Sequence, residues 1–413
     1  MTNVWRNVYN CGVNIVNAGS HSRWFLRPGT GEHALLDRLL TPDLFSGALN
    51  LEGLILDAPR IPAYGDVRKK LPLTTAVIVD PQVYRLQKSS CADHRGLTKL
   101  GYYPDGNPLG AESFLSPAFT AEFVSKVLDE QHAIQPTSYV APAFYVDSSS
   151  PAWAEVNTRL LQETLRQVGQ KVFATLCGSY ATLCRTVDPG PIAQSISLRG
   201  VEGVLVLVSP LTALTDSSTK LANYLRLLKS LRSTGLEVVA CRQPAFGLGC
   251  MALGVSGFDC GIGTAERFDF ASLTRPVRMA VARTDGKPAR KKSVYLPQVL
   301  TSVRSAVADA IFSTSGVAGS FVCNQGCCRD NIKTAIARSR EHFLYTRSWE
   351  VNEMKSLSMG WRYEHFNQTL VAARQMAEKI LRAFPGSPHT QFRHLDTWSG
   401  VLAEASEGLR RGA

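Results

Sequence analysis

The chain has 413 residues, of which 45% are hydrophobic and 19% charged, with 45 Lys and Arg against 34 Asp and Glu. This composition excludes disordered and collagen-like proteins and is typical of a globular protein with a large core. No segment approaches the roughly 18 apolar residues of a membrane span, and the N-terminal segment lacks the pattern of a secretory signal. We therefore expect a cytoplasmic protein without membrane contact, whose ten cysteines are buried thiols or metal ligands.

Short apolar runs recur along the chain and are typical of buried parallel strands. Between the later runs, residues 153–168 carry one apolar helical stripe, and residues 221–231 repeat it before Gly235. No Gly-rich phosphate fingerprint follows the first runs, so we favour a (β/α)8 TIM-type barrel over an open, doubly wound α/β sheet. The predicted strands are 54–56, 76–79, 139–146, 172–176, 204–208 and 238–240.

Strand-like runs stop near residue 310, and a cysteine-rich stretch and a helical stripe over 366–380 follow. We therefore predict two domains. Residues 1–310 form the barrel with an N-terminal extension, and residues 311–413 form a zinc-binding, helical C-terminal module.

The segment FVCNQGCCRD places Cys323, Cys327 and Cys328 within six residues, and His342 and His365 follow. Three thiolates and one imidazole make a closed, tetrahedral, structural zinc site. The spacing C-x3-C-C departs from the usual knuckle, so a buried cysteine cluster without metal is the alternative. We predict one structural zinc per chain.

Polar residues follow the predicted strands, where a barrel places its active groups. Asp57 and Asp259 each end an apolar run and would converge at the barrel mouth, where two carboxylates can divide the roles of nucleophile and general acid/base. The alternative is that each forms a helix cap or a turn. The other polar residues at predicted strand ends are Asp80, Asp147, Ser179, Ser209 and Gln243, of which Asp80 and Asp147 are the next candidates.

The positive charge is concentrated between residues 275 and 340, where twelve Lys and Arg stand against three Asp. Within this segment, KPARKK contains Lys287, Arg290, Lys291 and Lys292 in a loop-like cluster suited to phosphate contacts. A solvated loop without a ligand is the alternative. We predict nucleic-acid binding through this cluster.

From about residue 50 to 380, the order of these motifs resembles the tRNA-guanine transglycosylases, including their DNA-modifying relatives that insert 7-deazaguanine bases. LILDAPRIPAYGDV resembles the strand ending in the family's Asp-Ser-Gly-Gly-Phe-Gln signature, which implies that Asp57 is the general acid/base. GVSGFDCGIG is similar to the family's Phe-Asp-Cys strand, which implies that Asp259 is the nucleophile. The three cysteines match the family's zinc ligands in order, and HFNQ resembles its His-Asn, which favours His365 over His342 as the fourth ligand.

The resemblance also implies base-binding residues. In VAPAFYVDSSSP, Asp147 would face the polar edge of the base, and KVFATLCGSYATLCR is similar to the family's Gln-Gly-Gly segment. CRQPAFGLG stands where a glycine-rich loop touches the base in the family. Alanine, proline and arginine follow Asp57 in place of Ser-Gly-Gly, a cysteine replaces the glutamine, and Pro-Thr-Arg is missing after Asp259. The implied substrate-binding residues are Asp147, Cys177, Gly178, Ser179, Gly247 and Gly249.

The family's activity is the replacement of guanine in nucleic acid by a 7-deazaguanine-type base, as in queuosine, through a covalent aspartyl intermediate. The resemblance therefore implies a glycosyltransferase that binds tRNA or DNA and a purine or 7-deazapurine base, alone, as a homodimer or with a partner subunit. Because family residues are missing, a catalytically inactive barrel that binds nucleic acid or acts as a scaffold subunit is the alternative. A barrel enzyme acting on a small molecule is a third.

Overall fold

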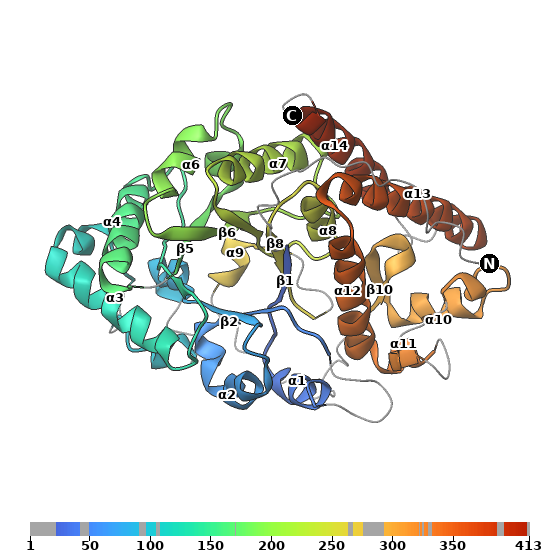
Figure 1. The fold of residues 1–413 in the computed structure, drawn as a ribbon, viewed down its shortest axis with the longest axis horizontal. Coiled ribbons are helices and arrows are strands. Elements are labelled where there is room, and N and C mark those ends of the chain that lie inside the picture. The colour runs from blue at the N-terminus through green and yellow to red at the C-terminus, as the bar shows by residue number, and fades with distance from the viewer. Residues whose placement is uncertain are drawn as a thin grey trace.

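Eight parallel strands form one sheet in the computed structural model, in the order β3-β2-β1-β8-β7-β6-β5-β4 (Figure 1). Every ladder in this sheet is parallel, and the order runs around a ring with β3 and β4 at its two ends. The strands are β1 (Arg23–Leu26), β2 (Gly53–Asp57), β3 (Ala76–Asp80), β4 (Tyr139–Val140), β5 (Val172–Ser179), β6 (Val201–Ser209), β7 (Glu237–Ala240) and β8 (Gly257–Cys260). The residues that the structure describes are 22–41, 49–90, 96–104, 108–169, 171–262, 267–275, 293–321, 323, 326–328, 333–385 and 392–410.

The two ends of the sheet meet just before β4. The amide of Thr137 donates to the carbonyl of Val77 at 2.7 Å, and the Thr137 hydroxyl accepts from the Val77 amide at 2.9 Å. These bonds connect β3 to the chain entering β4, so the sheet is a nearly closed barrel surrounded by helices. The predicted α/β barrel is confirmed at this level.

Helices follow most of the strands and cover the outside of the barrel (Figure 1). The predicted stripe of 153–168 becomes α4, which buries Trp153, Val156 and Leu160. The second stripe becomes α7, whose N-cap Ser217 accepts from the Lys220 amide. The helices of the barrel are α1 (His33–Leu39), α2 (Ile61–Lys70), α3 (Pro117–His132), α4 (Ala152–Gln167), α5 (Tyr180–Cys184), α6 (Gly190–Ile196), α7 (Ser218–Ser233), α8 (Phe246–Ala252) and α9 (Phe270–Leu273).

Side chains alternate between the barrel interior and the surrounding helices, as the two-residue repeat of a strand requires. On β1, Phe25 belongs to the interior cluster, whereas Trp24 and Leu26 pack against the outer helices. The same alternation points Arg27, one residue beyond β1, into the barrel. Interior apolar residues from the other strands include Ile55, Ile78, Val140, Phe173, Leu205, Leu207 and Val239.

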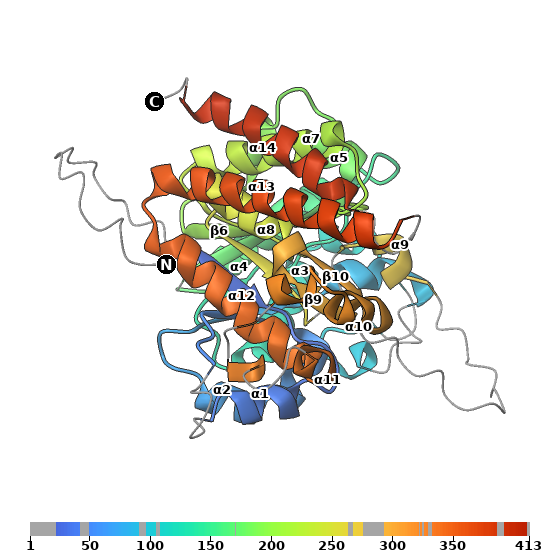
Figure 2. The same ribbon diagram turned by 90° about the vertical axis from the view of Figure 1, so that its right-hand side faces the viewer.

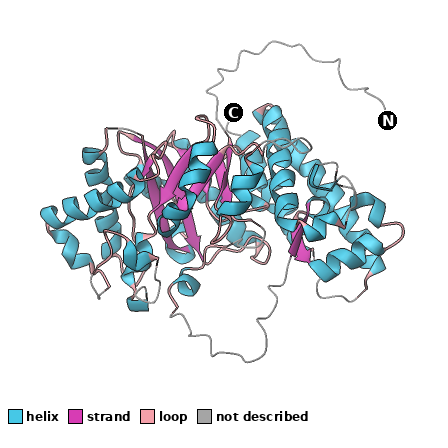
Figure 3. Ribbon diagram, turned by 90° about the horizontal axis from the view of Figure 1, so that it is seen from below, coloured by secondary structure: helices cyan, strands magenta, loops and turns pink. Residues whose placement is uncertain are grey.

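The C-terminal part of the chain lies against one side of the barrel (Figures 1 and 2). It begins with an antiparallel hairpin of β9 (Ser293–Leu296) and β10 (Thr301–Arg304), which packs among helices and lies apart from the barrel sheet (Figure 3). α13 contacts α8, and α14 contacts α7. The helices are α10 (Ser305–Ser313), α11 (Thr334–Ala337), α12 (Ser339–Ser356), α13 (Met359–Ala383) and α14 (Arg393–Arg410). No helix among the described residues combines the length and the apolar character needed to cross a membrane.

Three strands of the barrel differ from the sequence prediction. β1 and β8, with the sequences RWFL and GFDC, are not among the predicted strands, because each contains a charged residue and no β-branched residue. β4 is much shorter than the apolar run 139–146, because side-chain amides replace its ladder partners. Asn157 bonds both backbone groups of Phe144, and Gln87 bonds both backbone groups of Tyr145.

Candidate functional site

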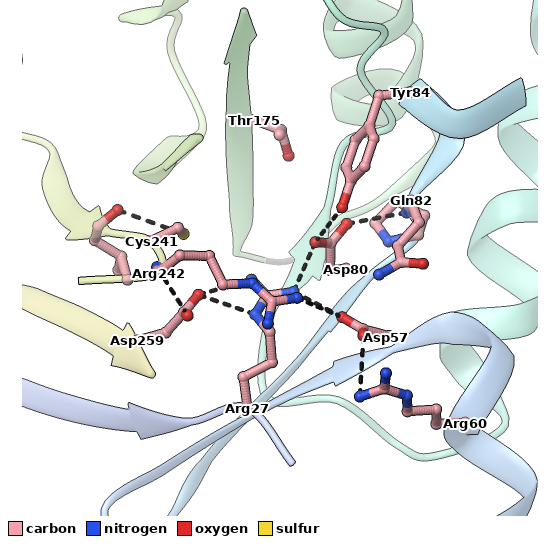
Figure 4. Close-up of polar contacts among 12 residues, drawn as sticks. Arg27, Asp57, Arg60, Asp80, Gln82, Tyr84, Thr175, Cys241, Arg242 and Asp259 are labelled. Atoms are coloured by element: carbon pink, nitrogen blue, oxygen red, sulfur yellow. Dashed lines mark hydrogen bonds and ion pairs between the residues drawn. The ribbon is translucent and has the colours of Figure 1, made fainter. Parts of the chain in front are cut away.

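Four charged side chains meet inside the barrel at the carboxyl ends of β1, β2, β3 and β8 (Figure 4). Arg27 Nη1 donates to Asp57 Oδ1 at 2.8 Å and to Asp80 Oδ2 at 2.7 Å. Its Nε and Nη2 donate to Asp259 Oδ2 at 3.0 and 2.7 Å. One guanidinium therefore ties together three carboxylates from three strands.

This cluster is removed from water. Arg27 is 1% exposed and Asp259 is 0% exposed. Burial would lower the pKa of Arg27, but the charges of Asp259, Asp80 and Asp57 outweigh burial and raise that pKa well above its ordinary value. The guanidinium therefore stays charged, and its contacts offset the several kcal/mol that a buried ion costs.

Asp57 also faces two arginines at the rim of the barrel. Arg60 Nη1 lies 3.2 Å from Asp57 Oδ2, and Arg242 Nη2 lies 3.7 Å from Oδ1. Burial would raise the pKa of Asp57, but Arg27, Arg242 and Arg60 together lower it to about 2. At neutral pH, Asp57 is therefore an ionised carboxylate and a weak base.

Arg242 contacts both predicted catalytic aspartates. Its amide donates to Asp259 Oδ1 at 3.0 Å, while its side chain reaches Asp57 (Figure 4). Its backbone has a φ of +60°, a left-handed conformation that costs a non-glycine residue on the order of 1 kcal/mol. Such strain is common at functional sites, and here it turns the Arg242 amide toward Asp259.

Asp80 is held by two further donors. The Gln82 amide donates to Asp80 Oδ1 at 2.9 Å, and the Tyr84 hydroxyl donates to Oδ2 at 3.2 Å. Burial and the charges of Asp80 and Asp57 raise the pKa of Tyr84 well above its ordinary value, so this hydroxyl keeps its proton. Asp80 completes the cluster that Arg27 organises.

The predicted pair, Asp57 and Asp259, lies at one end of one barrel. Asp57 Oδ1 and Asp259 Oδ2 accept from two nitrogens of the same guanidinium. Because those nitrogens are close together, the two oxygens lie no more than about 8 Å apart. That bound is compatible with the spacing of two-carboxylate glycosyl chemistry, roughly 5 to 9 Å. The sequence did not indicate that Arg27 stands between them.

Residues 267–275 cover this end of the barrel. Phe268 and Phe270 are buried and belong to the same interior cluster as the inward residues of the strands. Phe268 bridges to Leu211, and the Phe270 amide donates to Ser209 Oγ at 2.9 Å. In Figure 1, α9 is seen in projection within the ring of strands.

The three predicted cysteine ligands come together with His342. The Cys323–Cys327 and Cys327–Cys328 sulfur distances are 4.0 and 3.6 Å, and His342 Nδ1 lies 3.8 Å from Cys327 Sγ and 3.4 Å from Cys328 Sγ. All four ligand atoms lie within 4.8 Å of one another. A tetrahedral zinc with bonds of about 2.3 Å to sulfur and 2.0 Å to nitrogen has ligand separations of about 3.8 Å between sulfurs and 3.6 Å between sulfur and nitrogen.

The surroundings of the cluster also fit a metal. His342 Nε2 lies 3.0 Å from the Tyr295 carbonyl, which orients the ring and leaves Nδ1 for a metal. Hydrogen bonds with Cys323 and Cys328 raise the pKa of Cys327, so a cation is needed to make these sulfurs thiolates together. The cluster can therefore hold a metal ion, and the donor set matches structural zinc.

The prediction that His365 is the fourth ligand is wrong. His365 lies on α13, and its Nε2 is 3.9 Å from Glu353 Oε2. His342 lies on α12, which follows the cysteine segment closely. The placement of α12 beside the cysteines makes His342 the candidate ligand, whereas the local sequence around His365 resembled the family's motif more closely.

The predicted base-binding residues have diverse surroundings. Cys177 is buried in the barrel interior, and burial raises the pKa of its thiol. Ser179 caps α5 by accepting from the Thr182 amide, and Gly178 packs closely against the Val146 carbonyl. Asp147 is half-buried and accepts from the amide and hydroxyl of Ser149.

The prediction that Gly247 and Gly249 form a base-contacting loop is corrected. Both lie buried in α8. A Cβ at position 247 would meet the Phe258 ring at 2.2 Å, and one at position 249 would meet Leu402 at 2.9 Å. These glycines therefore allow α8 to pack against the barrel and the C-terminal helices.

The basic cluster Lys287, Arg290, Lys291 and Lys292 lies outside the described residues. Its predicted role in nucleic-acid binding stays a prediction.

Sequence reasoning missed Arg27 and Arg242. Strand alternation would have pointed Arg27 inward with Phe25 if β1 had been recognised. Arg242 directly follows Cys241, two residues beyond β7, but no sequence pattern indicates its left-handed backbone.

Comparison with known proteins adds little to this geometry. No protein-family model matches the chain, and no curated protein matches it. The crystal structure of RipC from Yersinia pestis is similar over 62% of this chain and 96% of RipC, at 11% sequence identity and a TM-score of 0.24. A likeness this weak carries no argument about fold or function.

Proposed function

We propose that this protein exchanges a base in nucleic acid, with guanine replaced by a 7-deazaguanine-type base, through a covalent aspartyl intermediate. The observation that carries the proposal is the pair of carboxylates, Asp57 and Asp259, held on one guanidinium at the carboxyl end of a (β/α)8-type barrel. This is the end at which barrel enzymes place their reactive groups.

Asp259 is the nucleophile in this proposal. Its carboxylate forms an ester bond to C1′ of the target nucleotide as the glycosidic carbon–nitrogen bond breaks, and the departing base takes the bonding electron pair and a proton that Asp57, first protonated from solvent, donates. The incoming base then attacks C1′, the ester bond breaks, and the carboxylate is restored. Asp259 is oriented for this by Arg27 and by the Arg242 amide, which fix both of its oxygens.

Asp57 accepts the proton of the incoming base. Its pKa, lowered to about 2 by the three arginines against the effect of burial, keeps Asp57 ionised but makes it a weak base. Its contact with Arg27 must therefore loosen, so that its pKa rises, both for it to accept this proton and for it to protonate the departing base. The structural zinc would be held by Cys323, Cys327, Cys328 and His342, and when bound it would stabilise the C-terminal module.

The decisive experiment uses wild-type protein with single-stranded and duplex RNA and DNA and labelled guanine or 7-deazaguanine. We expect incorporation of label and, on denaturing gels, a covalent adduct with the nucleic acid. Asp259→Asn should abolish both. The matched control is Asp66→Asn, which changes an exposed aspartate on α2 and should leave both unchanged. Full exchange by Asp259→Asn would overturn the assignment of the nucleophile.

A catalytically inactive, nucleic-acid-binding barrel is the second candidate. It is favoured by the burial of all three carboxylates, each 3% exposed or less, under residues 267–275. Saturable, salt-dependent binding of RNA or DNA by the wild-type protein, with neither adduct nor incorporated label, would establish this alternative.

A further inference from the structure

The Tyr145 ring lies flat against the Phe270 ring in the mouth of the barrel. The ring centroids are 3.9 Å apart, and the ring planes differ by 7°. This is the geometry in which a nucleobase stacks on an aromatic side chain. We propose that Tyr145 is the stacking platform for the exchanged base, and that Phe270 occupies the place of the base until the base displaces it. The proposal rests on the proposed function, because it names where the base binds.

The platform is rigid. Gln87 donates to the Tyr145 carbonyl at 3.0 Å and accepts from its amide at 2.7 Å, and the Tyr145 hydroxyl lies 3.4 Å from the Ser209 carbonyl. Tyr145 therefore keeps its position without Phe270. A preformed aromatic face lowers the entropy cost of binding a flat ring.

The segment that carries Phe270, residues 267–275, is short and is held by few hydrogen bonds. Phe270 belongs to α9, a helix of four residues, and its amide bonds Ser209 Oγ. The segment is also fixed by the bridge between Leu211 and Phe268 and by the hydrogen bond from Ser90 Oγ to the Thr274 carbonyl. Displacing the segment breaks these contacts and the edge-on contact between Phe268 and Tyr84, and it leaves the ladders of the barrel intact.

The position suits a base whose sugar is to react. Tyr145 and Phe270 belong to the interior cluster that also contains Tyr84, and Tyr84 donates to Asp80 beside Arg27. A purine-type ring in the place of Phe270 would therefore stand at the same end of the barrel as the Asp57–Asp259 pair.

The first test measures binding of a free purine, 2-aminopurine, whose fluorescence falls when it stacks. Phe270→Ser should bind it about tenfold more tightly than wild type, because the competing ring is gone. In the Phe270→Ser background, Tyr145→Leu should weaken binding at least about fivefold, whereas Tyr145→Phe should retain it. Phe119→Ser is the matched control, because it removes a ring packed on Phe114 and Phe123, outside the barrel interior cluster.

A second variant tests displacement when Phe270→Ser does not fold. Leu211→Cys with Phe268→Cys places two cysteines at bridge partners, a spacing that allows a disulfide. The oxidised form should lose purine binding by at least about tenfold, and reduction should restore it. Equal binding in the oxidised and reduced forms overturns the proposal, as does equal affinity of wild type and Phe270→Ser. If 2-aminopurine binds as expected but the protein exchanges no base in nucleic acid, the proposed function is overturned and the stacking platform stands. If the Tyr145 and Phe270 variants exchange bases and bind 2-aminopurine as wild type does, the platform is overturned and the proposed function stands.

Discussion

Arg27 is the residue on which the barrel site depends. Without it, three carboxylates would face one another in a space that water does not reach. Like charges at such distances cannot all stay ionised, so the charge state of the site is set by a side chain outside the predicted catalytic set.

We predict that Arg27→Gln lowers the free energy of unfolding by about 3–5 kcal/mol, because it leaves buried carboxylates without their cation. Arg27→Lys should be intermediate, since an ammonium cannot bond three carboxylates as a planar guanidinium does. Arg23→Gln is the control, because this arginine at the start of β1 is partly exposed and lies 3.9 Å from Glu237. Urea unfolding should detect a change below about 1 kcal/mol for the control. An equally small change for Arg27→Gln would show that Arg27 does not stabilise the three buried carboxylates.

The lowered pKa of Asp57 predicts a dependence of stability on pH. A carboxyl whose pKa is about 2 in the folded protein and near 3.8 when unfolded stabilises the fold above pH 4, and this contribution is lost as the pH falls toward 2. The loss is about 2 kcal/mol. Urea unfolding of wild type and Asp57→Asn between pH 5 and pH 2 measures it. The variant should lose less stability than wild type over that interval, and parallel curves would contradict the assignment.

Among the elements, α12 and the 3-10 helix Gly326–Cys328 form the candidate metal site by bringing His342 to the cysteines. His342→Gln should reduce bound zinc by at least about tenfold and lower Tm by several degrees, because a structural metal contributes directly to folding. His365→Gln, a change of the same kind on α13, should leave both unchanged. Metal analysis and thermal unfolding of the two variants decide between the ligands. Loss of zinc only in His365→Gln would reverse the assignment.

Elements could be predicted from the sequence where neighbouring residues alone form the pattern, and could not where the pattern depends on packing between distant segments. The strands Ala76–Asp80 and Val201–Ser209 contain the continuous apolar runs 76–79 and 204–208, and the three cysteines that come together lie within six residues of one another in the sequence. The choice between His342 and His365 depends on how two helices pack, which no local pattern contains. Gly247 and Gly249 were misplaced for the same reason, since a glycine allows close approach of a helix as well as of a ligand.

The whole molecule carries a formal charge of +11, and much of the excess lies in residues 275–340. Several of the lysines and arginines on the described helices have acidic partners one turn away. Lys69, Lys126, Arg166 and Arg382 each pair with an aspartate or glutamate three or four residues distant. The charge of such a paired cation is largely neutralised by its acidic partner, so it attracts a phosphate backbone only weakly. KPARKK contains no acidic residue.

We therefore predict that replacing Lys287, Arg290, Lys291 and Lys292 by Ala weakens nucleic-acid binding and flattens its salt dependence. If all four contact phosphates, the slope of log K against log salt should fall by about 3 to 4. The control replaces Lys69, Lys126, Arg166 and Arg382 by Ala, which removes the same total charge from exposed helices. Fluorescence anisotropy with labelled RNA and DNA over a salt series should find a large change for the first variant and a small one for the second. Equal changes in the two variants would mean that the net charge of the protein attracts the nucleic acid. No change in either variant would mean that KPARKK is a solvated loop and that the phosphate contacts lie elsewhere.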